Sequence, residues 1–507
     1  MSIVILGDVA ITHLYHVGDE AMTEYAIDAL RDRSIEDVVV VGNSKLVANR
    51  FGTSSVPRIG FDRTKSAAWR KARFDALMAS AAGEEGGLPA NDPAHKLIEA
   101  VRRSSGVLIA GGGNIASKFI NHLTERFALA ALARHFGVPL VLSSQTYGPE
   151  LKPVHEKQVL EMMNGAALVG ARERSSYELA LSLGSDPKKT YRGVDDAFWL
   201  RPQSADRERV AELELPADYM LASFTEHAGS TGISRKNYYH RIAQSLDELV
   251  ERFGMPVFLV SHVGSLDDPA VRSHDQLAND IIAGMTKSNR VSTLPMLTAR
   301  QVVAVTEQAR FNLSSRYHPA VFGAGAGVPS MCISLSLYSS VKLRGALKNV
   351  GMEEYAVQAA SWTPARVVEG AERMLDEDSG LDEHMRRIVE IRCKEGKQWW
   401  DLVAEVLTGA PAPVEIESVS EAKAWENLPS WSTENRTVTD LVERTDRKLT
   451  EKGWALEHAK WKAWKFEKTV EQLESDLNTV RSERDAIANE LTQTITENTS
   501  RKRRWRI

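Results

Sequence analysis

The sequence predicts an α/β protein with two doubly wound parallel sheets that face a cleft, followed by a helical extension. Three observations predict this fold class: short apolar strands alternate with helical segments, the alternation occurs twice, and the C-terminal end carries a heptad repeat. Strands that are apolar on both faces are typical of parallel sheets covered on both sides by helices. Their alternation with helices favours βα units and therefore a doubly wound arrangement.

The first series of strands occupies the N-terminal part of the chain. Its predicted strands are 3–8, 37–42, 106–114, 138–145 and 167–172, and helical spacing is found in 118–136 and 175–183. We assign these elements to an N-terminal α/β domain that spans residues 1–205.

A second series of the same kind follows a junction near residues 200–215. Its predicted strands are 219–224, 255–263, 311–318 and 328–335, within a C-terminal α/β domain with closing helices at residues 206–407. Open α/β sheets bind ligands at the carboxyl ends of their strands. Two such domains side by side therefore predict a ligand site in the cleft between them.

The chain changes character after about residue 410. Residues 408–437 have the Pro, Ser and Glu content of a linker, and residues 438–507 are predicted as a coiled-coil helix with a basic tail. Arg484 and Thr494 interrupt an otherwise apolar heptad. This pattern predicts a homo-oligomer through residues 456–494, a dimer or a trimer, and a single helix packed on the body is the alternative. The apolar a and d positions are Leu456, Ala459, Ala463, Phe466, Val470, Leu473, Leu477, Val480, Ile487 and Leu491.

The composition excludes several classes of protein. The net charge of −5 over 507 residues predicts no general attraction to nucleic acid. The two cysteines, Cys332 and Cys393, cannot build a disulfide framework or a cysteine zinc site. No signal peptide or membrane-spanning run is recognisable, so we expect a cytoplasmic protein.

The C-terminal helix carries features that suit a membrane surface. Trp454, Trp461 and Trp464 fall on outward positions among lysines, and residues 501–507 read "RKRRWRI". Exposed tryptophan beside lysine favours peripheral contact with an anionic leaflet, here the inner face of the membrane. The interpretation we prefer is a solvated charged terminus, with the tryptophans buried against the body.

Two stretches at predicted strand ends of the first domain are candidate binding elements. Asp19 follows the first strand, where it suits either the dipole of a helix start or a role as general base. Gly112, Gly113 and Asn114 belong to a glycine turn, "IAGGGN", whose backbone amides could face an anion. Glycines that only shape a tight βα turn are the alternative.

Cations and a histidine occupy the other candidate positions. Arg172 precedes a helix start and suits a phosphate or a carboxylate. Arg316 and His318, in "SSRYHPAVFGAGAGVP", point to one face if the stretch is extended, and the small residues allow close helix packing. Lys342 follows the next strand and adds a cation. Together these residues predict an anion site with a titratable imidazole.

Taken in order, these stretches resemble the polysaccharide pyruvyl transferase family. The resemblance rests on Gly18-Asp19-Glu20, "GGGN", "SQTYGP", "ARERSSYELALSLG", "VDDAFWL" and "SSRYHPAVFGAGAGVP" with Lys342, and it covers roughly residues 3–350. It implies a fold similar to that of two-domain (GT-B-like) glycosyltransferases. It also implies transfer of the enolpyruvyl group of phosphoenolpyruvate to a sugar, free or lipid-linked, without a metal or another cofactor.

The resemblance also implies roles for individual residues. Arg316, His318 and Arg172 would meet phosphoenolpyruvate, and Asp19 would act near the acceptor hydroxyl. His318 is the candidate acid, or the base on the hydroxyl, and Asp19 is the alternative base. The approach to Gly18 lacks the glycine- and asparagine-rich turn expected in this family.

Two other functions compete with this interpretation. A nucleotide-sugar glycosyltransferase or epimerase of the same fold would require an acidic ribose contact in the second domain, and none is evident. A non-catalytic coiled-coil assembly protein would not require the Arg316–His318 pair.

Overall fold

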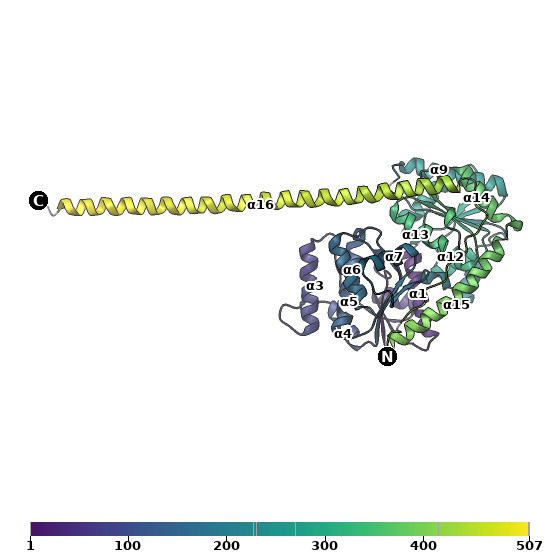
Figure 1. Ribbon diagram of the computed structural model, residues 1–507, viewed down its shortest axis with the longest axis horizontal. Helices are drawn as coiled ribbons and strands as arrows, with labels where there is room; N and C mark the ends of the chain where they lie inside the picture. Colours follow the sequence, from purple (N-terminus) through teal and green to yellow (C-terminus); the bar gives the residue numbers. More distant parts are fainter. Residues whose placement is uncertain (1, 227, 230, 269, 414, 505–507) are drawn as a thin grey trace. The chain divides into compact units, whose positions relative to one another are not determined.

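The computed structural model contains two parallel sheets, each flanked by helices (Figure 1). It describes residues 2–226, 228–229, 231–268, 270–413 and 415–504, with the backbone alone at 461, 485 and 488–504. Residues Met1–Arg444 form one compact unit, and Thr445–Ile507 form another that is described separately. The predicted fold class is confirmed.

The first sheet has the strand order β4-β3-β1-β5-β7-β8-β9, and β6 pairs with β7. All of these pairs are parallel. The strands are β1 (Ile3–Leu6), β3 (Val38–Val41), β4 (Ser54–Val56), β5 (Gly106–Ile109), β6 (Gly112–Ile115), β7 (Leu140–Tyr147), β8 (Leu168–Ala171) and β9 (Thr190–Arg192). The helices between them are α1 (Val17–Arg31), α2 (Ser44–Phe51), α3 (Ala67–Ala82), α4 (Ala94–Arg103), η1 (Ser117–Phe119), α5 (Ile120–His135), α6 (Pro153–Gly165) and α7 (Arg174–Leu183).

The central strand β1 is buried on both faces, which explains its continuous apolar sequence. Ile3 and Ile5 pack in one hydrophobic cluster, whereas Val4 and Leu6 pack in another. Successive side chains of a strand point to opposite faces, so a run without polar residues serves two helical layers.

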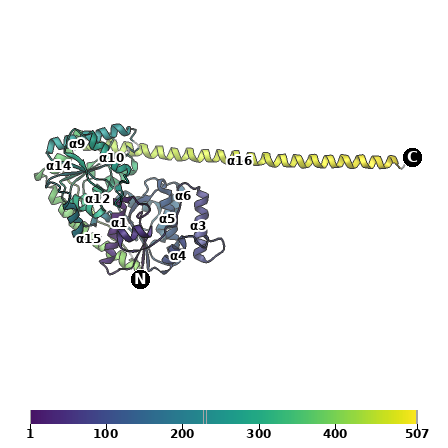
Figure 2. The same ribbon diagram turned by 180° about the vertical axis from the view of Figure 1, so that it is seen from behind.

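The second sheet has the order β13-β11-β10-β14-β15-β16, and it is also parallel. Helices α9 and α14 lie side by side beside it (Figure 2). The strands are β10 (Met220–Ser223), β11 (Val257–Leu259), β13 (Val291–Thr293), β14 (Phe311–Ser314), β15 (Ser330–Ser334) and β16 (Ala356–Gln358). The other elements are η2 (Asp196–Trp199), α8 (Ser204–Ala211), α9 (Arg235–Phe253), α10 (His274–Met285), α11 (Ala299–Glu307), α12 (Tyr317–Ala326), α13 (Leu337–Lys348), η3 (Glu353–Tyr355), α14 (Pro364–Leu375), η4 (Glu377–Ser379) and α15 (Leu381–Leu407).

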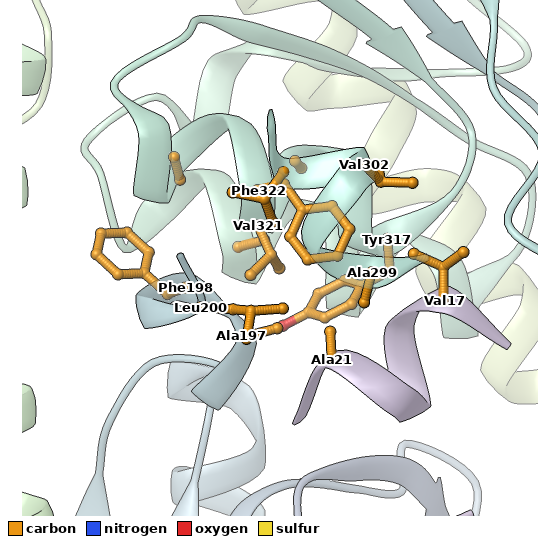
Figure 3. Packing of buried hydrophobic residues seen from close by; sticks show 14 of the residues in the cluster. Val17, Ala21, Ala197, Phe198, Leu200, Ala299, Val302, Tyr317, Val321 and Phe322 are labelled. Atoms are coloured by element: carbon orange, nitrogen blue, oxygen red, sulfur yellow. The ribbon is translucent and has the colours of Figure 1, made fainter. Parts of the chain in front are cut away.

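The two sheets belong to one unit because their flanking elements contact each other directly. Strand β2 (Tyr15–His16) pairs antiparallel with β12 (Val263–Gly264), so a loop of the first series is joined to the second. Figure 3 shows the apolar part of this contact, where side chains of α1, η2, α11 and α12 meet. Its labelled residues are Val17, Ala21, Ala197, Phe198, Leu200, Ala299, Val302, Tyr317, Val321 and Phe322.

The segment predicted as a linker, 408–437, differs from that expectation. It is largely irregular, but Val419, Trp425 and Trp431 are buried, and helix α16 (Ser432–Arg504) begins within it. These apolar side chains hold the segment on the body despite its polar composition. Helix α15, which we placed with the second domain, contacts β5 and β7 of the first sheet.

The C-terminal unit is helical throughout its described part, as the heptad predicts. The apolar heptad side chains with described exposure leave much of their surface uncovered, with Phe466 72% and Leu473 62% exposed. The structure does not describe the side chains of Trp461, Leu491 and Thr494. It also does not describe the side chains of the basic segment 501–507. Within the described chain, no helix has the length and apolarity needed to cross a membrane.

Candidate active site between the two sheets

Arg172 lies at the centre of the candidate site, directly after β8. Its side chain is fully buried, with Nε donating to Thr146 Oγ1 at 2.8 Å and Nη1 donating to Asp195 Oδ2 at 2.6 Å. Glu173 lies 3.1 Å from Nε, and its other oxygen accepts a hydrogen bond from Ser176. The remaining nitrogen, Nη2, has no hydrogen-bond partner within the described structure. Arginine stays charged, so this buried N–H group is available to an anion.

Helix α13 of the second series brings two further donors to the same place. The Tyr338 hydroxyl donates to the carbonyl oxygen of Gly113 at 2.6 Å, and Lys342 Nζ donates to that hydroxyl at 3.2 Å. Asn349 Nδ2 donates to the Arg172 carbonyl at 2.9 Å, which ties the end of the helix to the first domain. The turns of α13 therefore hold the two domains together at the site.

Gly113 marks the point on which these donors converge. A Cβ atom at this position would lie 2.7 Å from the Tyr338 oxygen, 2.9 Å from Lys342 Nζ and 3.0 Å from Arg172 Nη2. Only glycine leaves this space without displacing a donor. We call Arg172, Tyr338 and Lys342 the donor cluster.

The donor cluster changes the protonation of its own lysine. Burial, together with repulsion from Arg172, lowers the pKa of Lys342 to about 7, although nearby carboxylates oppose the change. Neutral and charged forms of this amine are therefore similarly populated near neutral pH. A bound anion would favour the charged form.

His318 contacts the site from the first turn of α12. A Cβ atom on Gly18 would overlap its ring, so the start of α1 and the histidine are in direct contact. Its Nε2 atom is 3.9 Å from Asp195 Oδ2 and has no hydrogen-bond partner among the described residues. Burial, followed by the charges of Arg172 and Lys342, holds the pKa of His318 well below its usual value.

Arg316 and His318 do not share the extended geometry that would place them on one face. Strand β14 ends at Ser314, Arg316 is the N-cap residue, and His318 is already helical, so the alternation of an extended chain does not apply. The Arg316 guanidinium instead forms an ion pair with Asp275 and donates through Nε to the Phe224 carbonyl at 3.1 Å. The proposed role of Arg316 in substrate binding stays a prediction.

A second polar cluster, which the sequence analysis missed, lies at the end of β1. Asp8 accepts hydrogen bonds from Arg126 Nη2 at 2.6 Å, His122 Nδ1 at 2.6 Å and the side chain of Asn114. Although burial opposes ionisation, Arg126 and His122 hold the pKa of Asp8 well below its usual range. We call Asp8, Asn114, His122 and Arg126 the Asp8 cluster. The signal for it was a lone aspartate after an apolar strand, the same signal that pointed to Asp19.

Asp19 and the glycine turn lie between the two clusters. Asp19 is in the first turn of α1, and burial, followed by the charge of Asp8, raises its pKa. Lys342 counteracts this shift, so the carboxylate lies within the field of the donor cluster. Gly112, on β6, pairs with Gln145 on β7. Gly113 contacts the donor cluster, and the Asn114 side chain donates a hydrogen bond to Asp8. The structure thus gathers Asp19, Gly113, Asn114, Arg172, His318 and Lys342.

No metal-binding arrangement accompanies these groups. Within the described residues, no three His, Cys, Asp or Glu side chains are placed to hold an ion. The charges of the site are instead balanced by arginine and lysine.

A comparison with known families identifies the chain. The sequence profile for polysaccharide pyruvyl transferase matches residues 16–336. The chain belongs to the polysaccharide pyruvyl transferase family. The matched span contains Arg172 and His318, whereas Asp8, Tyr338 and Lys342 lie outside it and join the site only through the fold.

The fold of this pyruvyl transferase family member is similar to that of a solved protein assigned as a sugar-nucleotide epimerase. A Listeria monocytogenes protein assigned as a UDP-N-acetylglucosamine 2-epimerase has a TM-score of 0.53 and 12% identity, covering 82% of this chain and 99% of its own. The UDP-GlcNAc 2-epimerase from Methanocaldococcus jannaschii has a TM-score of 0.48 and 12% identity, covering 78% and 100%. At such identities only the GT-B-like fold is shared. A search of curated proteins finds no match.

Proposed function

We propose that this protein transfers the enolpyruvyl group of phosphoenolpyruvate to a sugar of a polysaccharide or glycolipid precursor, forming a pyruvate ketal. The observation that carries the proposal is the donor cluster at Gly113. Arg172 Nη2 is buried without a partner and shares this position with Lys342 and the Tyr338 hydroxyl. Phosphoenolpyruvate is a small trianion, and the buried N–H groups of Arg172 and Lys342 suit its phosphate and its carboxylate, whereas the Tyr338 hydrogen is bonded to the Gly113 carbonyl.

The reaction requires a proton donor and a base, and two hydroxyl protons are released: one replaces the proton given to the methylene carbon, and the other leaves with the phosphate. Protonation of the methylene carbon makes C2 electrophilic, a sugar hydroxyl attacks C2, phosphate leaves, and a second hydroxyl closes the ketal ring. His318 is unprotonated in the free site, because its pKa is held well below its usual value. The negative charge of phosphoenolpyruvate favours protonation of His318 and Lys342. In this scheme His318 then delivers the proton to the methylene carbon.

The Asp8 cluster supplies the base for the acceptor hydroxyl. Asp8 is ionised and only accepts hydrogen bonds, so His122 Nδ1 must carry the proton of the bond between them. In neutral His122 the lone pair is then on Nε2, which suits the removal of a hydroxyl proton. Asp19, half-buried nearby with a raised pKa, is the other candidate base.

The sugar-nucleotide alternative makes a different binding prediction. The fold is shared with a protein assigned as a UDP-N-acetylglucosamine 2-epimerase, which would require a nucleotide site in the second domain. The unpartnered nitrogen of Arg172 favours the phosphoenolpyruvate site instead.

Ligand-induced stabilisation distinguishes the two functions. The melting temperature of the full chain is measured with phosphoenolpyruvate and, separately, with UDP-N-acetylglucosamine. We expect phosphoenolpyruvate to raise it and the nucleotide sugar to leave it unchanged. Lys342→Gln should remove the effect of phosphoenolpyruvate. The matched control is Lys348→Gln on the same helix, whose amine pairs with Glu353 at 3.1 Å and should keep the effect. Stabilisation by the nucleotide sugar alone would overturn the proposal.

A further inference from the structure

The C-terminal helix presents an apolar seam that its own unit does not cover. Along α16, the large heptad residues from Leu456 to Ile487 are all exposed in the described helix. A helix with a continuous seam of period 3.5 is under-packed alone and becomes stable when the seam meets a partner helix. The seam consists of Leu456, Phe466, Val470, Leu473, Leu477, Val480 and Ile487.

The charges that flank the seam identify the partner as another copy of this helix in the same direction. In a parallel pair, each g position faces the e position of the following heptad in the other chain. This register sets Lys462 against Glu467 and Asp476 against Arg481, two attractive pairs in each direction. Lys462, Glu467 and Arg481 form no ion pair in the described part of the chain, so they are available for these contacts.

An antiparallel pair of the same length would have unfavourable charges. In that arrangement e positions face e positions, so Lys460 would meet Arg481 and Glu467 would meet Glu474. The g positions would add one kind of attractive pair, Lys462 with Glu483, against the two kinds of repulsive pair at the e positions. Like charges at such flanking positions destabilise the pairing.

We propose that residues 456–487 form a parallel, in-register, two-stranded coiled coil with a second copy of this chain. Arg484 occupies an a position and is exposed, and a long charged side chain at a seam can reach water in a two-stranded coil. The interaction does not depend on the proposed enzymatic reaction. In this coiled coil, the α16 helix of the second copy covers the exposed seam.

Cross-linking tests the direction and the register. Val480 is at a d position, so Val480→Cys, in a chain with Cys393→Ser to remove the exposed native thiol, brings two identical positions together across a parallel seam. We expect rapid formation of a disulfide-linked dimer under mild oxidation. Thr479→Cys, one residue earlier on an outward position, is the matched control and should cross-link slowly. Equal rates for the two variants would overturn the parallel register.

Charge exchange tests the partner. The mass of the full chain in solution should be that of a dimer, and Lys462→Glu should raise the dimer dissociation constant by about tenfold or more, because it faces Glu467. Adding Glu467→Lys should restore the wild-type constant. Lys465→Glu makes the same charge change on an outward position and should have little effect. A monomeric or trimeric wild type, or no restoration by the exchange, would contradict the proposal.

Discussion

Arg172 illustrates how one residue serves both fold and site. Two of its three nitrogens are committed to Thr146, Glu173 and Asp195, which fix the guanidinium plane. The third nitrogen is left without a partner at Gly113. Because the bonded nitrogens already hold the guanidinium rigid, the Arg172 side chain loses little conformational entropy when its free nitrogen binds an anion.

Lys342 should make phosphoenolpyruvate binding dependent on pH. Its pKa is about 7 in the free protein, and a bound anion raises it, so binding takes up a proton above neutral pH. We expect the dissociation constant to rise by up to about tenfold per pH unit above about pH 7, and calorimetry in buffers of different ionisation enthalpy to show proton uptake. Lys342→Arg stays charged and should lose the part of this dependence that the lysine contributes, so that only proton uptake by His318 remains. A pH-independent wild type would exclude the lysine from the anion site.

His122→Asn tests the base. The asparagine amide can replace the Nδ1 donor to Asp8 while removing Nε2, so folding and stabilisation by phosphoenolpyruvate should persist. Phosphate release with an acceptor glycoside that supports wild-type turnover should fall by roughly 10²–10⁴-fold. His155, whose Nδ1 is 2.7 Å from Ser117 Oγ, is the control, and His155→Asn should keep turnover. Unchanged turnover in His122→Asn would leave Asp19 as the base.

At the scale of elements, the small residues of α12 determine how closely it packs against η2 and β14. A Cβ atom on Gly325 would overlap the carbonyl of Phe198 in η2, and one on Gly323 would lie 2.7 Å from Asn312 Nδ2. Gly327 has a different role, because it ends the helix with a φ of 75° and has open space around it. The prediction that this run serves close packing is confirmed for Gly323 and Gly325.

Gly325→Ala should therefore destabilise the protein by about 1–3 kcal/mol, since the added methyl meets backbone that cannot rotate away. The denaturant midpoint measures this change. Gly284→Ala, in helix α10 with nothing within 4 Å, is the control and should be neutral or stabilising. A midpoint for Gly325→Ala equal to that of the control would show that the helix can move away from η2 at no cost.

At the scale of the whole molecule, ionic contacts between α1 and α11 join the two domains. Arg300 Nε lies 3.6 Å from Glu24, the same guanidinium pairs with Asp28, and the Ala299 amide donates to the Tyr15 hydroxyl at 2.9 Å. One oxygen of Glu24 is buried without a hydrogen-bond partner in the described structure. Burial raises the pKa of Glu24 to about 7, although Arg300 opposes the shift.

This carboxyl group should make stability fall between about pH 4.5 and pH 7. The folded protein holds the proton in that range while the unfolded chain releases it, so the free energy of unfolding decreases as pH rises. Glu24→Gln should remove roughly 1–3 kcal/mol of this decrease, measured by denaturant unfolding at several pH values. Glu36→Gln, on an exposed carboxylate, is the control and should retain the wild-type slope. Parallel slopes for wild type and Glu24→Gln would contradict the shift.

The sequence by itself determined the fold class, the two series of strands, the helical tail and the family. Each of these depends on local periodicity or on short motifs, and local chain geometry enforces both. It also placed Arg172, His318 and Lys342 at the ends of elements. Only the tertiary structure decided which of them meet. The extended geometry assumed for Arg316 and His318 failed because Tyr317 already begins a helix.

The donor cluster and the Asp8 cluster required the fold because their members are distant in sequence. Gly113 meets Tyr338 and Lys342 across more than two hundred residues, and Asp8 meets Arg126 across more than one hundred. No spacing rule connects such positions. They come together because the carboxyl ends of parallel strands share one edge, and because α12 and α13 of the second sheet are held against that edge.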